Sequence, residues 1–109
     1  MAEAKHAGNE NDVPEAIRAL VAQYLVKRRV DVQRIYNCLN LGKLKEVASI
    51  GHNMKGTGVG FGLPDATKIG LNLEMAAKSG DVSAIRQETA ALCELLGRVE
   101  PEFIGARTD

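Results

Sequence analysis

Residues 43–62 read KLKEVASIGHNMKGTGVGFG, and their apolar and small positions repeat with the period of an α-helix. On a helical wheel, at about 100° per residue, these positions gather on one side. They are Leu44, Val47, Gly51, Met54, Gly58 and Phe61. The repeat predicts an amphipathic helix over residues 43–62 whose apolar face packs against a core.

Upstream of this segment, apolar residues recur at helical spacing over residues 17–25 and again over residues 32–39. The charged run Lys27-Arg28-Arg29 separates the two stretches. The pattern is compatible with one long helix or with two helices that meet near residues 29–31.

Downstream, two further segments have the same helical repeat. The first contains Ala66, Ile69, Gly70, Leu73, Ala76 and Ala77, and the second contains Ile85, Thr89, Leu92, Leu96 and Val99. Boundary signals separate the segments: Pro14 and Pro64 suit the first turn of a helix, and Asp81 suits an N-cap. Gly42 and Gly80 suit helix ends, where the backbone turns left-handed.

Short connections between successive amphipathic helices predict an all-α fold, an antiparallel up-and-down four-helix bundle. An extra short N-terminal helix is compatible with the same pattern. The chain has 109 residues, which is enough for one domain. We expect a disordered tail over residues 1–12, the domain over residues 13–100 and a C-terminal tail over residues 101–109.

The composition agrees with helices, since there is no Trp and only two Tyr and two Phe, whereas strands favour aromatic residues. Cys38 and Cys93 lie far apart and belong to no metal-binding motif. No signal peptide and no apolar run of membrane-spanning length is recognisable. We therefore expect reduced thiols and a cytoplasmic location.

Charge is unevenly distributed along a chain whose formal net charge is zero. From Arg18 to Lys55 there are eight basic and two acidic residues, so this segment carries +6. Such asymmetry indicates a basic face that attracts acidic partners. An ordinary solvated helix surface is an equally good interpretation.

His52 lies away from the apolar face of the segment 43–62. The residues on its side of the wheel are Lys45, Ser49, Gly56, Val59 and Gly60. A glycine inside a helix costs about 1 kcal/mol relative to alanine, so Gly56 calls for a reason. Its missing side chain would leave room beside the imidazole for another protein's active site.

The chemistry of the histidine side chain agrees with that placement. Imidazole titrates near neutral pH, and its neutral form is a nucleophile that can attack phosphorus. Lys55 lies on the adjoining ridge of the same helix, where its ammonium group could neutralise phosphoryl oxygens. A P-loop is excluded, because the stretch GHNMKGT from Gly51 to Thr57 has no Lys after its second glycine.

His52, Lys55 and Gly56 together form an HxxKG motif, and the stretch LEMAA follows at residues 73–77. Both motifs, and their spacing over residues 13–100, resemble the histidine phosphotransfer (HPt) domain family. The resemblance implies that His52 accepts the phosphoryl group, that Lys55 assists it and that Gly56 leaves the ring accessible. It also implies that Glu74 accepts a hydrogen bond from Nδ1 of the ring and leaves Nε2 as the nucleophile.

The resemblance further implies a phosphohistidine carrier in a two-component phosphorelay, not an enzyme with its own turnover. Its partners would be response-regulator receiver domains, a histidine kinase, or both, and the receiver would bring the Mg²⁺. We expect a monomer with no cofactor or metal of its own, no nucleic acid and no membrane as partner. Two alternatives remain: a helical adaptor that is not phosphorylated, and a domain excised from a larger kinase.

Overall fold

The computed structural model describes residues 14–104, which form four α-helices and one 3₁₀ helix and contain no strand. The elements are α2 (Glu15–Leu41), α3 (Leu44–Thr57), η1 (Val59–Phe61), α4 (Pro64–Lys78) and α5 (Val82–Phe103). The all-helical prediction is confirmed for this part of the chain. The predicted N-terminal tail and the extra N-terminal helix lie outside the described residues. Within residues 14–104, no helix combines the length and the apolar character needed to cross a membrane.

α2 is one continuous helix, so the alternative of two helices that meet near residues 29–31 is wrong. Two of the three side chains in the charged run find partners. Arg28 and Asp31 are both buried, with Arg28 Nε 2.8 Å from Asp31 Oδ2. Arg29 donates two hydrogen bonds to the Glu100 carboxylate on α5. The charges therefore join α2 to its surroundings and do not break the helix.

The predicted helix boundaries at Gly42, Pro64, Gly80 and Asp81 are confirmed. Gly42 and Gly80 both have φ of 72°, which a residue without Cβ adopts readily, and they follow the ends of α2 and α4. Pro64 is the first residue of α4. Asp81 caps α5, because its Oδ1 accepts a hydrogen bond from the Ala84 N–H at 3.0 Å.

α3 ends at Thr57 and not at residue 62, which corrects the predicted range. Beyond it, η1 forms a tight 3₁₀ turn, and Gly62 adopts a left-handed conformation with φ of 77°. The Leu63 N–H then donates to the Gly58 carbonyl at 2.8 Å. These bonds redirect the chain towards the start of α4. The helical wheel drawn for residues 43–62 therefore does not apply to the residues after Thr57.

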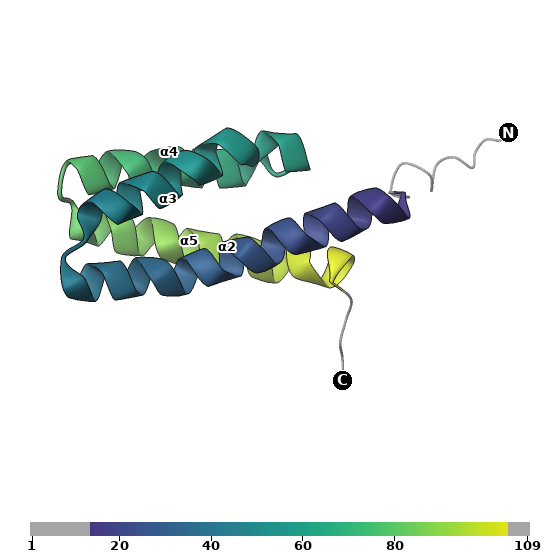
Figure 1. The fold of residues 1–109 in the computed structure, drawn as a ribbon, viewed down its shortest axis with the longest axis horizontal. Coiled ribbons are helices and arrows are strands. Elements are labelled where there is room, and N and C mark those ends of the chain that lie inside the picture. The colour runs from purple at the N-terminus through teal and green to yellow at the C-terminus, as the bar shows by residue number, and fades with distance from the viewer. Residues whose placement is uncertain (1–13, 105–109) are drawn as a thin grey trace, which may run out of the picture.

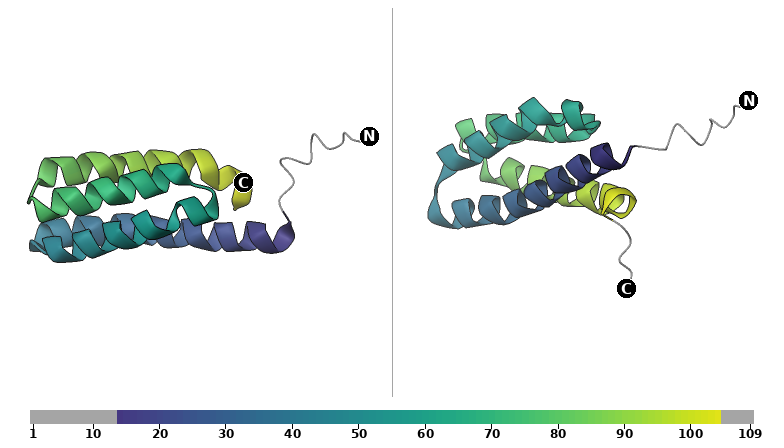
Figure 2. Two further views of the ribbon diagram at one scale, coloured as in Figure 1. Left: turned by 90° about the horizontal axis from the view of Figure 1, so that it is seen from above. Right: turned by 45° about the vertical axis from the view of Figure 1, so that its right-hand side comes forward.

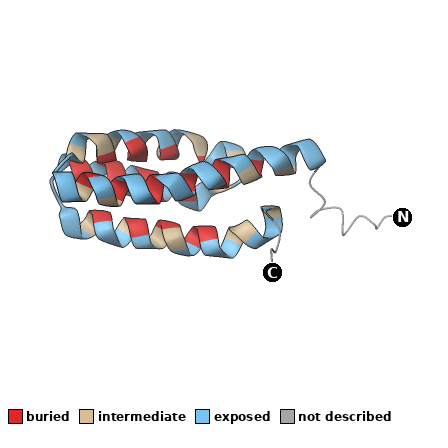
Figure 3. Cartoon of the chain, turned by 60° about the horizontal axis from the view of Figure 1, so that its bottom comes forward, coloured by how far each residue is buried: buried red, intermediate tan, exposed pale blue. Residues whose placement is uncertain are grey.

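The hydrophobic core lies between the four helices, whose buried positions face inward in Figure 3. α3 packs on α4, α4 on α5, α5 on α2 and α2 on α3, as the views in Figures 1 and 2 agree. The most completely buried side chains are Leu25, Ile35, Val47, Met54, Leu73, Ile85, Thr89, Leu92 and Leu96. Ile50 is also buried, although the sequence-based core face of its helix omitted it.

Glycines bring the backbones of α3 and α4 into direct contact. A Cβ added to Gly51 would lie 2.7 Å from both the Gly70 carbonyl oxygen and the Glu74 nitrogen. A Cβ added to Gly70 would lie 2.6 Å from the Gly51 carbonyl oxygen, and one added to Gly58 would lie 2.5 Å from the Thr67 nitrogen. No side chain fits at these positions while the helices stay in place. The close approach sets Glu74 on α4 beside α3.

α5 continues through Pro101 to Phe103, so helix replaces the first residues of the predicted C-terminal tail. Contacts with the start of α2 hold this last turn. Arg18 donates a hydrogen bond to the Glu102 carbonyl, and its guanidinium lies 5.1 Å from the centre of the Phe103 ring. The Ile104 N–H closes the helix on the Glu100 carbonyl at 2.8 Å.

Candidate functional site

The carboxylate of Glu74 on α4 gathers three nitrogen-bearing side chains around it. Lys55 donates to its Oε1 at 2.9 Å, and Nδ1 of His52 lies 3.2 Å from its Oε2. Lys78, one turn later on α4, places Nζ 3.2 Å from the same Oε2. The structure thus brings together three residues that the sequence singled out, His52, Lys55 and Glu74, and adds Lys78.

The members of this cluster differ in exposure. The His52 side chain is 66% exposed, whereas the Glu74 side chain is only 11% exposed. Lys55 is half-buried and Lys78 is exposed. The buried carboxylate therefore holds the cluster in place, and the imidazole lies on the surface within reach of another molecule.

The pKa of the Glu74 carboxyl is lowered from its ordinary 4.5 to about 2. The largest cause is the hydrogen bond from Lys55, followed by the one from Lys78. Burial of the carboxyl opposes them by raising the pKa, and the hydrogen bond from His52 adds to the lowering. Glu74 is accordingly an ionised hydrogen-bond acceptor at neutral pH.

An ionised carboxylate can only accept hydrogen bonds, and this fixes the tautomer of His52. Nδ1, the ring nitrogen beside Glu74 Oε2, carries the hydrogen. The lone pair of the neutral ring then sits on Nε2, which is the nitrogen away from the carboxylate. The site therefore presents an oriented nucleophilic nitrogen on an exposed ring.

We expect Glu74 to stabilise the fold above its unfolded-state pKa of about 4.5 and to lose that contribution as the pH falls towards 2. The sign follows because the folded protein holds this proton more weakly than the unfolded chain does. Urea unfolding midpoints of the native protein and of Glu74→Gln, measured from pH 6 to about pH 2, test this. The native midpoint should fall more steeply below pH 4.5. Parallel pH profiles would contradict the assignment.

An open hollow of about 380 Å³ lies beside His52, with Ser49, Asn53 and Lys78 among the residues that line it. Ser49 and Asn53 are exposed residues of α3. A Cβ added to Gly56 would meet nothing within 4 Å, so the surface one turn after His52 is open. This face of α3 can admit a second protein.

Of the five residues predicted to form the partner surface, three lie on α3 with His52 and two lie beyond the end of that helix. Lys45 and Ser49 are exposed on α3, and Gly56 lies near its end. Val59 and Gly60 lie in η1 beyond the end of the helix, and Val59 is 65% exposed. Their position on the His52 side of the wheel was a consequence of extending the helix too far. Gly60 instead lines an apolar groove near the start of α2.

Lys78 is a member of the cluster that the sequence interpretation missed. A lysine four residues after a glutamate on a helix is a recognised ion-pair spacing, and Glu74 to Lys78 has it. That signal carries little weight on a surface helix. It gains meaning only once α3 places His52 against the same carboxylate oxygen.

Comparisons with known proteins add no family to this geometry. No protein-family model, no curated protein and no solved structure matches the chain. Within residues 14–104, no three His, Cys, Asp or Glu side chains come close enough to hold a metal ion.

Proposed function

We propose that this chain is a histidine phosphotransfer protein that carries a phosphoryl group on Nε2 of His52. One observation carries the proposal: an exposed imidazole on a bundle helix is held through Nδ1 by a buried, ionised carboxylate. The HxxKG motif formed by His52, Lys55 and Gly56 supports it independently. The same proposal includes an antiparallel up-and-down order of the helices, supported by the two-residue connection between α2 and α3.

The transfer step uses the lone pair on Nε2. That pair forms a bond to the phosphorus of an aspartyl phosphate while the bond from phosphorus to the aspartate oxygen breaks, and the aspartate leaves as a carboxylate. The phosphorylated ring keeps its hydrogen on Nδ1 and gains positive charge. The Glu74 carboxylate, 3.2 Å from Nδ1, stabilises that charge. In the reverse direction the ring returns the group to another aspartate.

Lys55 and Lys78 supply the positive charge that phosphoryl transfer needs. Both ammonium groups are held near the ring by Glu74, on separate helices. Each is on a flexible stem, so either can turn towards a phosphoryl oxygen without a backbone movement. Phosphoryl transfer depends mainly on positioning and on neutralised charge, and the Mg²⁺ and aspartates would come from the partner.

The partner in this proposal is the acidic active site of a receiver domain, and a histidine kinase is the alternative donor. Lys27, Lys43 and Lys45 are exposed in the basic segment and favour encounter with an acidic surface. Arg28, Arg29 and Arg34 contribute less, because each is paired with an acidic residue. A cytoplasmic setting belongs to the same proposal, since two-component receivers act there.

Labelling tests the proposal directly. The full chain is incubated with Mg²⁺ and a receiver domain carrying radioactive phosphate on its aspartate. We expect label to move to this chain in a form that acid releases and base does not, and mass spectrometry should locate it on His52. No transfer from a panel of receivers and kinases, or a label that base releases, would overturn the assignment.

Glu74→Ala should slow phosphoryl transfer by about tenfold to a hundredfold, by analogy with the loss of the carboxylate that orients a metal-binding histidine. The reason is loss of the fixed tautomer, which ¹⁵N chemical shifts of the His52 ring report. Glu74→Gln is the matched variant, because its carbonyl oxygen can still accept from Nδ1. Its ring should keep the Nδ1–H tautomer. Unchanged ring shifts in Glu74→Ala would remove the proposed role.

Gly56→Ala should separate stability from function. The position is helical and open, so alanine should raise the free energy of unfolding by up to about 1 kcal/mol. The added methyl stands one turn from His52, where it would hold a partner away and slow transfer by about tenfold or more. Thermal unfolding and the transfer rate measure the two effects. A variant that is more stable and equally fast would show that Gly56 has no part in access.

A further inference from the structure

Arg28 is a buried charge that the phosphotransfer site does not use. It extends from α2 with only 9% of its surface exposed, and its guanidinium lies 4.5 Å from the centre of the Tyr24 ring. Asp31 Oδ2 is 2.8 Å from Nε, but Nε makes no hydrogen bond within the described residues. Asp31 therefore compensates the charge at the inaccessible Nε, and a ligand in the neighbouring pocket would meet the terminal amino groups of Arg28.

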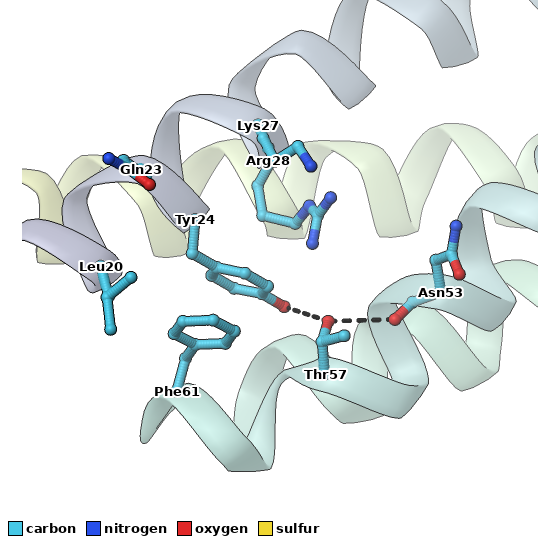
Figure 4. Close-up of a pocket in the computed structure, with 8 residues that line it drawn as sticks. All are labelled: Leu20, Gln23, Tyr24, Lys27, Arg28, Asn53, Thr57 and Phe61. Atoms are coloured by element: carbon cyan, nitrogen blue, oxygen red, sulfur yellow. Dashed lines mark hydrogen bonds between the residues drawn. The ribbon is translucent and has the colours of Figure 1, made fainter. Parts of the chain in front are cut away.

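The guanidinium is directed into a pocket of about 390 Å³ between α2 and α3, as Figure 4 shows. This volume lies within the range of small-molecule sites, about 300–1,000 Å³. Lys27 adds a second positive charge, and the side-chain amides of Gln23 and Asn53 complete the polar wall. No acidic residue of the described chain lines it; Asp31 lines a neighbouring hollow and is shared with Arg34.

The apolar wall of the pocket adjoins Arg28. Leu20 and the rings of Tyr24 and Phe61 form it; the two rings stack with centres 4.3 Å apart and planes inclined by 16°, and the Tyr24 ring lies beside the guanidinium. The Tyr24 hydroxyl is already bonded to Thr57 Oγ1 at 2.9 Å, and Thr57 donates to the Asn53 carbonyl. The hydroxyls are thus satisfied within the protein, which leaves Arg28, Lys27 and the side-chain amides of Gln23 and Asn53 to bind a ligand.

We propose that this pocket binds a small amphipathic carboxylate, with its charged group on Arg28 and Lys27 and a ring-sized apolar body against Leu20 and Phe61. A planar guanidinium is the side chain best suited to a carboxylate. The inference does not rest on phosphorylation of His52. Asn53 lines both this pocket and the hollow beside His52, so an occupant adjoins the face where a partner would bind.

Benzoate is the probe, and NMR of the ¹⁵N-labelled full chain is the measurement, at an ionic strength held constant with chloride. We expect saturable shifts of the Arg28 Nε–H and of the backbone amides of Asn53 and Thr57. Benzamide, the neutral counterpart, should cause none. Arg28→Gln should weaken benzoate binding at least about tenfold, or about 1.4 kcal/mol. Arg86→Gln, which removes an exposed arginine of α5, should bind as the native protein does.

A second variant keeps the proposal testable if Arg28→Gln does not fold. Arg28→Gln also removes a partner of the buried Asp31, whereas Lys27 is exposed and Lys27→Gln should leave the fold intact. Its affinity for benzoate should fall about threefold, as expected for one exposed charge. Shifts that do not saturate, that benzamide reproduces, or that survive in both variants would overturn the site. So would binding of inorganic phosphate with no response to benzoate, because the apolar wall would then have no role.

Discussion

His52→Gln is expected to accept no phosphoryl group from any receiver that labels the native chain. Glutamine has no nucleophilic ring nitrogen, so the covalent step has no acceptor. The fold should be unaffected, since the replaced side chain is two-thirds exposed and surface substitutions change stability by about 0.5 kcal/mol or less. The transfer assay, run beside circular dichroism on the same preparation, measures both.

The chain has one other histidine, His6, which provides a matched control. His6→Gln removes the same chemical group at a position far from the HxxKG motif in sequence, and it should label like the native chain. Label that persists in His52→Gln, or that disappears equally from both variants, would contradict the assignment of the acceptor.

Gly70→Ala is expected to destabilise the fold by about 3 kcal/mol, at the upper end of the effects of overpacking. An added Cβ would lie against backbone atoms of Gly51, Met54 and Lys55, and these cannot turn aside as a side chain can. The helices would have to separate, which would also draw Glu74 away from His52. Urea denaturation followed by circular dichroism measures the loss.

Gly97→Ala is the matched control for this substitution. Gly97 lies inside α5, is exposed, and has no atom within 4 Å of an added Cβ. Alanine there should raise stability by up to about 1 kcal/mol through helix propensity alone. Equal effects of the two substitutions would mean that the close contact between α3 and α4 does not constrain the fold.

Much of this architecture could be predicted from the sequence, because local signals specify it. The apolar repeat and the boundary residues Gly42, Pro64, Gly80 and Asp81 act over a few positions, and each has the predicted role. The grouping of His52, Lys55 and Glu74 came from a resemblance in their spacing. The structure gives the distances that connect them.

The remaining features depend on contacts between segments that are far apart in sequence. Arg29 pairs with Glu100, 71 residues away, and a charge run alone gives no sign of that partner. At the end of α3, Gly58 lies so close to Thr67 on α4 that a Cβ would meet the Thr67 backbone nitrogen. Glu100 and Thr67 lie on other helices, so the periodicity of one segment could not reveal these contacts.

The glycine contact between α3 and α4 has a consequence for how such a protein can diverge. One pair of helices, α3 and α4, carries the side chains of His52, Glu74, Lys55 and Lys78. Because the backbones of the two helices touch, these four side chains keep their positions relative to one another. Lys27 is exposed on α2, and Lys43 is exposed in the turn that follows it. The carboxylate pocket we propose lies partly on α2 as well. Under the proposed function, a chimaera that exchanges only the exposed residues of α2 should alter encounter with an acidic partner through Lys27 and leave the His52 cluster in place.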